Sequence, residues 1–252
     1  MSSPFSALFG ENLFLSPDPL LVRPAKEVAR ESKLLCLAMD QIARAWASFE
    51  ADDYRSAEAG FRSILNTPGI DKAQQEQAQF GLGYALAFLG QYGEAREMFG
   101  QLYHHAGLRG EWVAEHRALH QVGMVERMAE NWEAAQTCFE RERQLIEQHG
   151  SPDLAVSVNA YELGLVALHL GQADVSRLWF STCLTHAERT DDLIAVACAY
   201  RGLGDWFQHQ GELVAASDVW EKALLIFQEA DNPKAVREVQ ERQAALGGLG
   251  VR

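Results

Sequence analysis

Hydrophobic and small residues recur along this chain in blocks, and the blocks align with one another. In the four clearest blocks a glycine column is spaced 40, 41 and 40 residues apart, at Gly83, Gly123, Gly164 and Gly204. A turn-forming residue comes seven positions after this glycine, a small residue five positions later, and a large aromatic residue four positions beyond. Repetition with a period of this size is typical of repeat proteins.

A fifth, weaker copy precedes these four, so each column has five members. The turn column is Asp52, Gly90, Glu130, Gly171 and Gly211; the small column is Ala57, Ala95, Ala135, Ser176 and Ala216; the aromatic column is Phe61, Phe99, Phe139, Phe180 and Trp220. The turn column predicts where one helix ends, and residues four apart share one face of the next helix. Each block therefore predicts a helix–turn–helix pair that buries its apolar face only against its neighbours.

The columns resemble the tetratricopeptide repeat (TPR) from about Ala38 to Ala230. The usual TPR period is 34 residues, so a period of about 40 predicts helices about one turn longer. Such lengthened repeats resemble those of some signalling scaffolds and bacterial peptide-pheromone receptors. The resemblance implies an all-α, superhelical solenoid of about five repeats with a C-terminal capping helix.

Three segments are expected. An N-terminal apolar extension, residues 1–31, packs on the solenoid, either as a cap over the first repeat or in the groove of its own or a second copy, which allows a homodimer. Its first 23 residues are rich in large apolar side chains, which a solvated tail lacks. Five repeats follow within residues 32–230, and residues 231–252 form a capping helix and a frayed tail. The repeats are expected at about 33–66, 71–106, 111–149, 152–188 and 191–230.

The composition argues against several classes of protein. The formal net charge of −13 disfavours binding to nucleic acid and to anionic membrane surfaces, and no long apolar run predicts a membrane span. The N-terminus lacks the basic start and continuous apolar core of a secretory signal, which predicts a cytoplasmic protein. Four scattered cysteines and the lone His116–His120 pair predict neither a metal site nor a cofactor. No catalytic constellation is present, so we expect no enzyme.

Besides the apolar face that packs against neighbouring helices, the first helix of each repeat carries a second stripe of side chains. By resemblance to TPR proteins, this stripe lines a concave ligand groove. The other interpretation is that these large side chains only pack against the next helix. The stripe is aromatic at the N-terminal end and becomes charged towards the C-terminal end, where each arginine either holds a ligand or pairs with a nearby acid such as Glu126 or Asp205. The expected groove residues are Trp46, Phe49, Phe80, Tyr84, Phe88, His120, Met124, Arg127, Tyr161, Leu165, His169, Arg201 and Asp205.

These features predict a non-catalytic scaffold that binds a protein or peptide in its groove. The alternative is a regulatory sensor, whose solenoid binds a small signalling peptide and thereby changes its affinity for a target. The resemblance to pheromone receptors motivates this alternative. The positions that hold a carboxylate clamp in some TPR proteins carry Ile42, Trp46, Gly81, Arg117 and Gln121 here, so binding of that kind is not expected.

Overall fold

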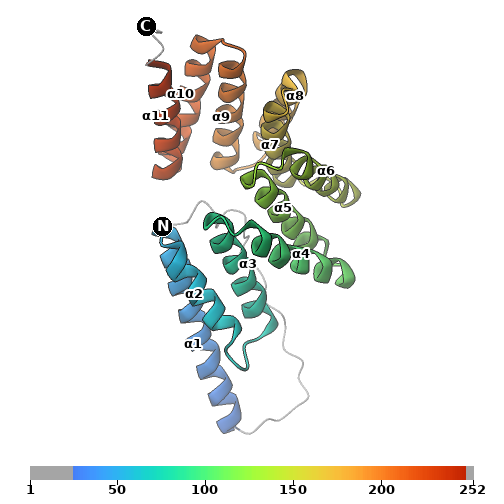
Figure 1. The fold of residues 1–252 in the computed structure, drawn as a ribbon, viewed down its shortest axis with the longest axis vertical. Coiled ribbons are helices and arrows are strands. Elements are labelled where there is room, and N and C mark those ends of the chain that lie inside the picture. The colour runs from blue at the N-terminus through green and yellow to red at the C-terminus, as the bar shows by residue number, and fades with distance from the viewer. Residues whose placement is uncertain (1–24, 248–252) are drawn as a thin grey trace. The chain divides into compact units, whose positions relative to one another are not determined.

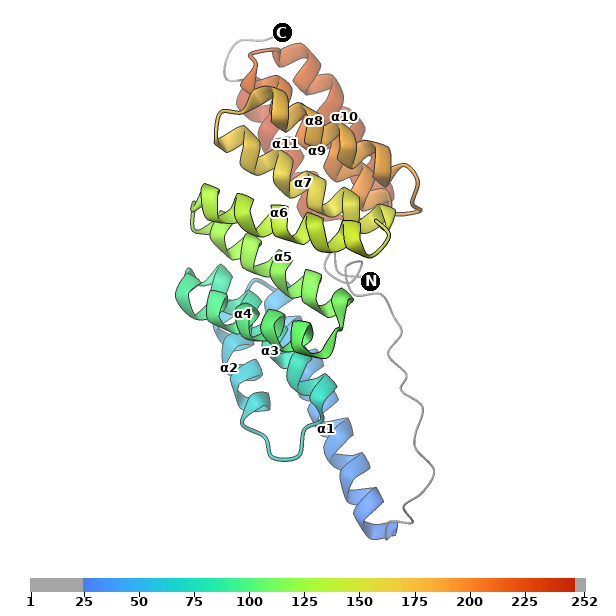
Figure 2. The same ribbon diagram turned by 90° about the vertical axis from the view of Figure 1, so that its right-hand side faces the viewer.

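A computed structural model describes the backbone of residues 25–247 and the side chains of residues 38–246. Eleven helices and no strand occupy this part of the chain, which confirms the all-α repeat fold (Figures 1 and 2). The N-terminal extension lies largely outside the described residues, as does the C-terminal tail after residue 247. The first helix, α1, already begins at Ala25, inside the segment assigned to that extension.

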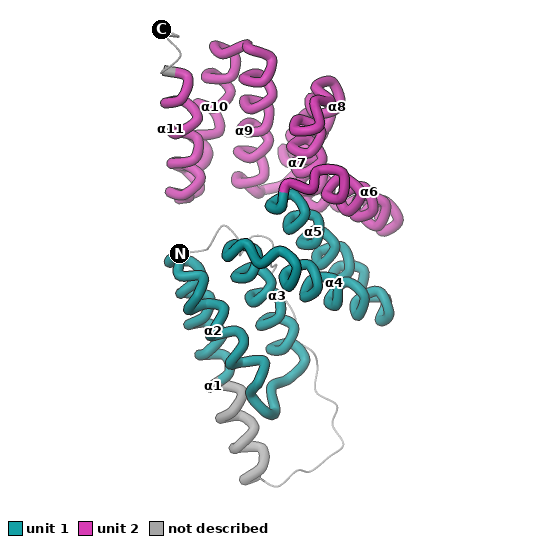
Figure 3. Tube along the Cα trace, in the orientation of Figure 1, with its two compact units in different colours: residues 1, 3–129 teal, residues 2, 130–252 magenta. Residues whose placement is uncertain are grey.

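The described chain divides into two units (Figure 3). Unit 1 ends at Ala129, and its helices are α1 (Ala25–Glu50), α2 (Tyr54–Leu65), α3 (Lys72–Phe88), α4 (Tyr92–Arg109) and α5 (Trp112–Met128). Unit 2 begins at Glu130, and its helices are α6 (Trp132–Gln148), α7 (Asp153–His169), α8 (Ala173–Ala187), α9 (Leu193–His209), α10 (Leu213–Glu229) and α11 (Pro233–Gly247). Within each unit, successive helices pack against one another as antiparallel neighbours.

The turn column closes the first helix of each repeat. All five of its residues have a positive φ, between 59° and 77°: Asp52, Gly90, Glu130, Gly171 and Gly211. At α3 the amide of Gly90 donates to Ala87 O and that of Gln91 to Leu86 O, at 3.0 and 2.9 Å. This pair of bonds satisfies the last carbonyls of the helix and reverses the chain at once.

The aromatic column supplies the core of both units. All five aromatic residues of the column are at most 1% exposed. A Cβ atom added at Gly83 would lie 2.5 Å from the Phe99 ring, and one added at Gly204 would lie 2.3 Å from the Trp220 ring. Phe180 lies against glycines of two successive repeats, Gly164 and Gly202. Phe99, Phe180 and Trp220 therefore each occupy a space that exists only because the facing helix lacks a side chain there.

Side-chain caps set the start of several helices. Asp71 and Gln74 form a reciprocal capping box at α3, and Asp192 accepts from the Ala195 amide at 3.0 Å at α9. At α11, the nearly buried Asn232 accepts from the Ala235 amide at 3.1 Å, directly before Pro233. Asn followed by Pro is a strong signal for the start of a helix. The Asn side chain accepts a hydrogen bond from one of the first amides, and Pro has no amide N–H that needs a partner.

We predict that Gly83→Ala lowers the free energy of unfolding by about 1–3 kcal/mol, because the new methyl group forces Phe99 out of its place. Gly100→Ala is the matched control in the same unit. It lies inside α4, and a Cβ atom added there would meet nothing within 4 Å, so this change should raise stability by about 0.5–1 kcal/mol. Urea denaturation measures both changes, and equal effects would contradict the packing role of Gly83.

Candidate functional site

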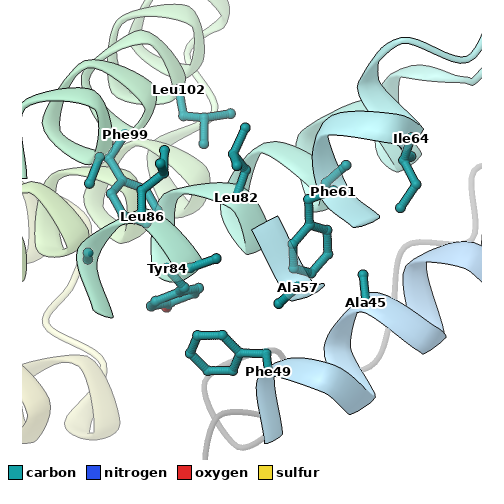
Figure 4. Close-up of a cluster of buried hydrophobic side chains, with 14 of the residues drawn as sticks. Ala45, Phe49, Ala57, Phe61, Ile64, Leu82, Tyr84, Leu86, Phe99 and Leu102 are labelled. Atoms are coloured by element: carbon teal, nitrogen blue, oxygen red, sulfur yellow. The ribbon is translucent and has the colours of Figure 1, made fainter. Parts of the chain in front are cut away.

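The predicted aromatic stripe of unit 1 belongs to one cluster of rings, of which Figure 4 shows Phe49 and Tyr84. Tyr84 of α3 lies 6.0 Å from Trp46 and 6.1 Å from Phe49 of α1, measured between ring centroids. Phe88, one turn further along α3, lies 5.3 Å from Phe49 and stacks on Tyr54 of α2 at 4.9 Å. Rings from three helices are therefore brought together at this end of the unit.

Burial divides the members of this cluster into two groups. Phe49 and Tyr84 are each 5% exposed and belong to the core, where burial raises the pKa of the Tyr84 phenol above its ordinary value. Phe88 is 37% exposed, and Trp46, Tyr54 and Phe80 are partly exposed. We call these four the aromatic surface of unit 1. Packing between helices thus accounts for only part of the predicted aromatic stripe, and the rest stays accessible.

Arg117 of α5 adds a cation to this surface, a role that no sequence pattern predicted. Its guanidinium carbon lies 5.7 Å from the centroid of the Phe80 ring, within the range of cation–π attraction. Burial lowers the pKa of Arg117 from its ordinary value, and the nearby Tyr84 partly opposes this shift. Arginine that faces apolar and aromatic groups is weakly hydrated and suited to contacts at interfaces.

The other predicted residues of unit 1 lie on α5. His120 is 6% exposed and therefore offers little surface to a ligand. Arg127 donates to Met124 Sδ at 3.6 Å. The acidic neighbour Glu126 is held by another arginine, Arg96 of α4, whose Nη2 lies 2.9 Å from Glu126 Oε2.

In unit 2 the predicted polar end of the stripe is occupied by α11. Arg201 of α9 donates to the Tyr161 hydroxyl at 2.8 Å and pairs with Glu238 of α11 at 2.8 Å. One turn further, Asp205 accepts from Arg242 Nε at 2.9 Å and from Trp220 Nε1 at 3.0 Å. Two ion pairs therefore join α9 to α11. The arginine lies on α9 in the first pair and on α11 in the second.

These two ion pairs change the interpretation of Arg201 and Asp205. The sequence suggested Asp205 as one possible partner for Arg201, but the structure pairs Arg201 with Glu238. Glu238 and Arg242 of the capping helix both contact α9. Burial raises the pKa of Asp205 even though Arg242 opposes the shift. In this structure Arg201 and Asp205 position the capping helix.

The remaining predicted residues lie on α7. Tyr161 packs against Phe180 at 5.9 Å between ring centroids, and Leu165 is partly buried. His169 is exposed and stacks almost parallel on Trp132, with centroids 3.9 Å apart and planes 5° apart. No sequence motif indicated this stack, because the two residues come from different helices.

Two kinds of feature are absent from the described part of the chain, a cluster of metal-ligating side chains and a membrane-spanning helix. Among residues 38–246, no group of three or more His, Cys, Asp or Glu side chains is placed to hold a metal ion. None of the helices between residues 25 and 247 is long and apolar enough to cross a membrane.

Comparisons with known proteins identify the fold. No protein-family model and no curated protein sequence matches the chain. Among solved structures, BtubC (BKLC) from P. vanneervenii has a TM-score of 0.61 at 14% identity, covering 83% of this chain and 93% of its own. The signal transduction ATPase with a tetratricopeptide repeat sensor from Pyrococcus horikoshii has a TM-score of 0.62 at 16% identity, covering 79% and 31% respectively.

A Rap protein complexed with competence and sporulation factor has a TM-score of 0.58 at 13% identity, covering 84% of this chain and 63% of its own. These similarities show that the chain has a TPR-like helical-repeat fold. At such low identity they define the fold alone, because one fold carries many different functions.

We predict that Arg242→Ala lowers the free energy of unfolding by about 2–4 kcal/mol at neutral pH, because it leaves the Asp205 carboxylate buried and unpaired. Burial already raises the pKa of Asp205, and removing Arg242 raises it further. Asp205 of the folded variant then binds a proton more readily than Asp205 of the unfolded variant. The loss of stability caused by Arg242→Ala should therefore shrink as the pH falls through the pKa of Asp205 in the folded variant.

Arg237→Ala is the control, since Arg237 lies on the exposed side of the same helix and its loss should change stability little. Denaturant unfolding at a series of pH values measures both variants. A loss for Arg242→Ala that is independent of pH would contradict the role assigned to Asp205.

Proposed function

We propose that this protein is a non-catalytic scaffold that binds a protein or peptide partner on the first helices of its repeats. The proposal rests on one observation above all, the aromatic surface of unit 1. Phe88 is 37% exposed and stacks on the partly exposed Tyr54, and Trp46 and Phe80 are also partly exposed, although the buried rings of the cluster already fill the core. Aromatic side chains that stay accessible on a rigid, well-packed support are typical anchors of protein interfaces.

The chemistry of this surface suggests what it binds. Four aromatic rings provide contacts for large apolar side chains, and Arg117 beside Phe80 provides a cation for a carboxylate or a backbone carbonyl. An extended peptide or an amphipathic helix with apolar anchors and an acidic group has this pattern. The net charge of −13 argues against nucleic acid and anionic membranes as partners.

We expect Phe88→Ala to weaken binding of selected peptides at least tenfold, or about 1.4 kcal/mol, because it removes the most exposed anchor of the surface. The probe is a random peptide library displayed on phage and selected on the full chain. Synthetic copies of the enriched peptides are then titrated by calorimetry. Enriched peptides should share large apolar residues at helical or extended spacing.

Leu108→Ala is the matched control, since Leu108 is a 74% exposed apolar residue on α4 of the same unit. It should leave peptide affinity unchanged, and thermal melts should show that both variants stay folded. If no peptide is enriched, or if Leu108→Ala weakens binding as much as Phe88→Ala, the aromatic surface is not the binding site.

The alternative function is a regulatory sensor in which a bound signalling peptide changes the affinity for a target. Two structural neighbours favour it, the ATPase with a tetratricopeptide repeat sensor and the Rap protein complexed with competence and sporulation factor. A sensor requires a ligand that distinguishes two conformations. Small-angle scattering of the chain with and without an enriched peptide separates the two functions: a changed profile supports the sensor, and an unchanged profile supports the scaffold.

A further inference from the structure

A cavity of about 250 Å³ lies in unit 2 between α6, α7 and α8. None of the thirteen predicted groove residues lines it. It is therefore separate from the aromatic surface of unit 1, and it differs from that surface in chemistry. One part of its wall is apolar, and another part carries an arginine.

The apolar wall of the cavity includes residues of the core. Ile146 of α6 and Ala160 of α7 are each 1% exposed, and Val156 of α7 and Trp179 of α8 also line the cavity. Pockets for drug-sized ligands are typically about 300–1,000 Å³, so this cavity suits a single large side chain better than a whole cofactor. The Trp179 ring provides a flat surface for such a group.

Arg143 of α6 provides the polar wall. Its guanidinium carbon lies 6.0 Å from the Trp179 ring centroid, and its Nη1 pairs with Glu147 one turn along the helix. Its Nε is buried and donates no hydrogen bond to the described residues. Buried N–H groups in native proteins nearly always have an acceptor, and for a guanidinium the strongest acceptor is a carboxylate.

Two acidic side chains near the cavity, Glu147 and Asp153, leave Arg143 able to bind the carboxylate of a ligand. Glu147 is 53% exposed, so its pairing with Arg143 contributes little and is readily shared or exchanged. Asp153 is held by His186 at 2.6 Å and lies 3.5 Å from Arg189. The Arg189 guanidinium therefore compensates part of the negative charge of Asp153.

We propose that this cavity binds an apolar side chain of a partner protein, with the carboxylate of a neighbouring acidic residue on Arg143. The volume and the apolar wall select one large side chain, and Trp179 favours an aromatic one. Arg143 selects the acidic neighbour. A free small acid shares this chemistry, but it lacks the flanking backbone that a partner places across the open side of the cavity.

Two capped dipeptides test the proposal on the full chain, N-acetyl-Phe-Asp-amide and its uncharged counterpart N-acetyl-Phe-Asn-amide. Binding is followed by the indole N–H resonance of Trp179 in the ¹⁵N spectrum, assigned with Trp179→Phe. The acidic dipeptide should bind with a Kd of about 1 mM, as expected for a ligand of this size, and the uncharged one at least tenfold more weakly. Equal affinities for the two dipeptides would overturn the proposal. So would an unshifted Trp179 indole resonance at a concentration of the acidic dipeptide tenfold above that Kd.

The free acid 3-phenylpropionate is the third probe. It should bind more weakly than the acidic dipeptide, because it makes no backbone contact. If it binds as tightly or more tightly, the cavity takes a small free acid, and the inference of a partner protein is wrong.

Variants locate the binding. Arg143→Gln should weaken binding of the acidic dipeptide at least tenfold and leave binding of the uncharged dipeptide unchanged. Arg141→Gln, on the exposed side of the same helix, should change neither. Thr182→Leu fills the cavity from α8 and should abolish both. If Arg143→Gln proves unstable in a thermal melt, Thr182→Leu still decides, and retention of binding in that folded variant refutes the site. Phe88→Ala should have no effect here, so this test is independent of the aromatic surface.

Discussion

The packing of one large aromatic side chain against a glycine of the facing helix is the contact on which the rest of this structure depends. Phe99 against Gly83, Phe180 against Gly164 and Trp220 against Gly204 are the same contact in three of the repeats. Each contact lets two helices approach until the ring fills the space between their backbones. Phe180 also reaches Gly202 of the following repeat, so the same ring sets the spacing within one helix pair and between two. A solenoid follows from repeating this contact.

Close packing of the helices limits what their remaining faces can do. On α3 and α1 it buries Tyr84 and Phe49 and leaves Phe88 at the edge. On α9 it brings Arg201 and Asp205 into a partly buried position, where each charge needs a counter-charge. Glu238 and Arg242 of α11 supply these counter-charges. The last helix is therefore joined to unit 2 by specific ion pairs as well as by apolar packing.

The two proposed binding surfaces differ in chemistry. The aromatic surface of unit 1 combines exposed rings with Arg117, whereas the cavity of unit 2 combines a small apolar space with Arg143. Both pair an arginine with an aromatic ring, at 5.7 Å for Phe80 and 6.0 Å for Trp179. An arginine held in this way keeps its donors directed while its flat face is covered. A partner with both apolar and acidic residues meets complementary groups at either place.

The sequence alone determined the repeat, the turns and the core. Column spacing was sufficient to identify Phe99, Phe180 and Trp220 as buried residues, because each depends on local helix geometry and on a glycine in the same block. It could not separate Tyr84, which is buried, from Phe88, which is exposed, since both lie on one stripe of one helix. It also could not pair Arg201 with Glu238 or place Arg143 beside Trp179. These contacts join side chains 36 or 37 positions apart, and only the tertiary packing of whole helices decides which of them meet.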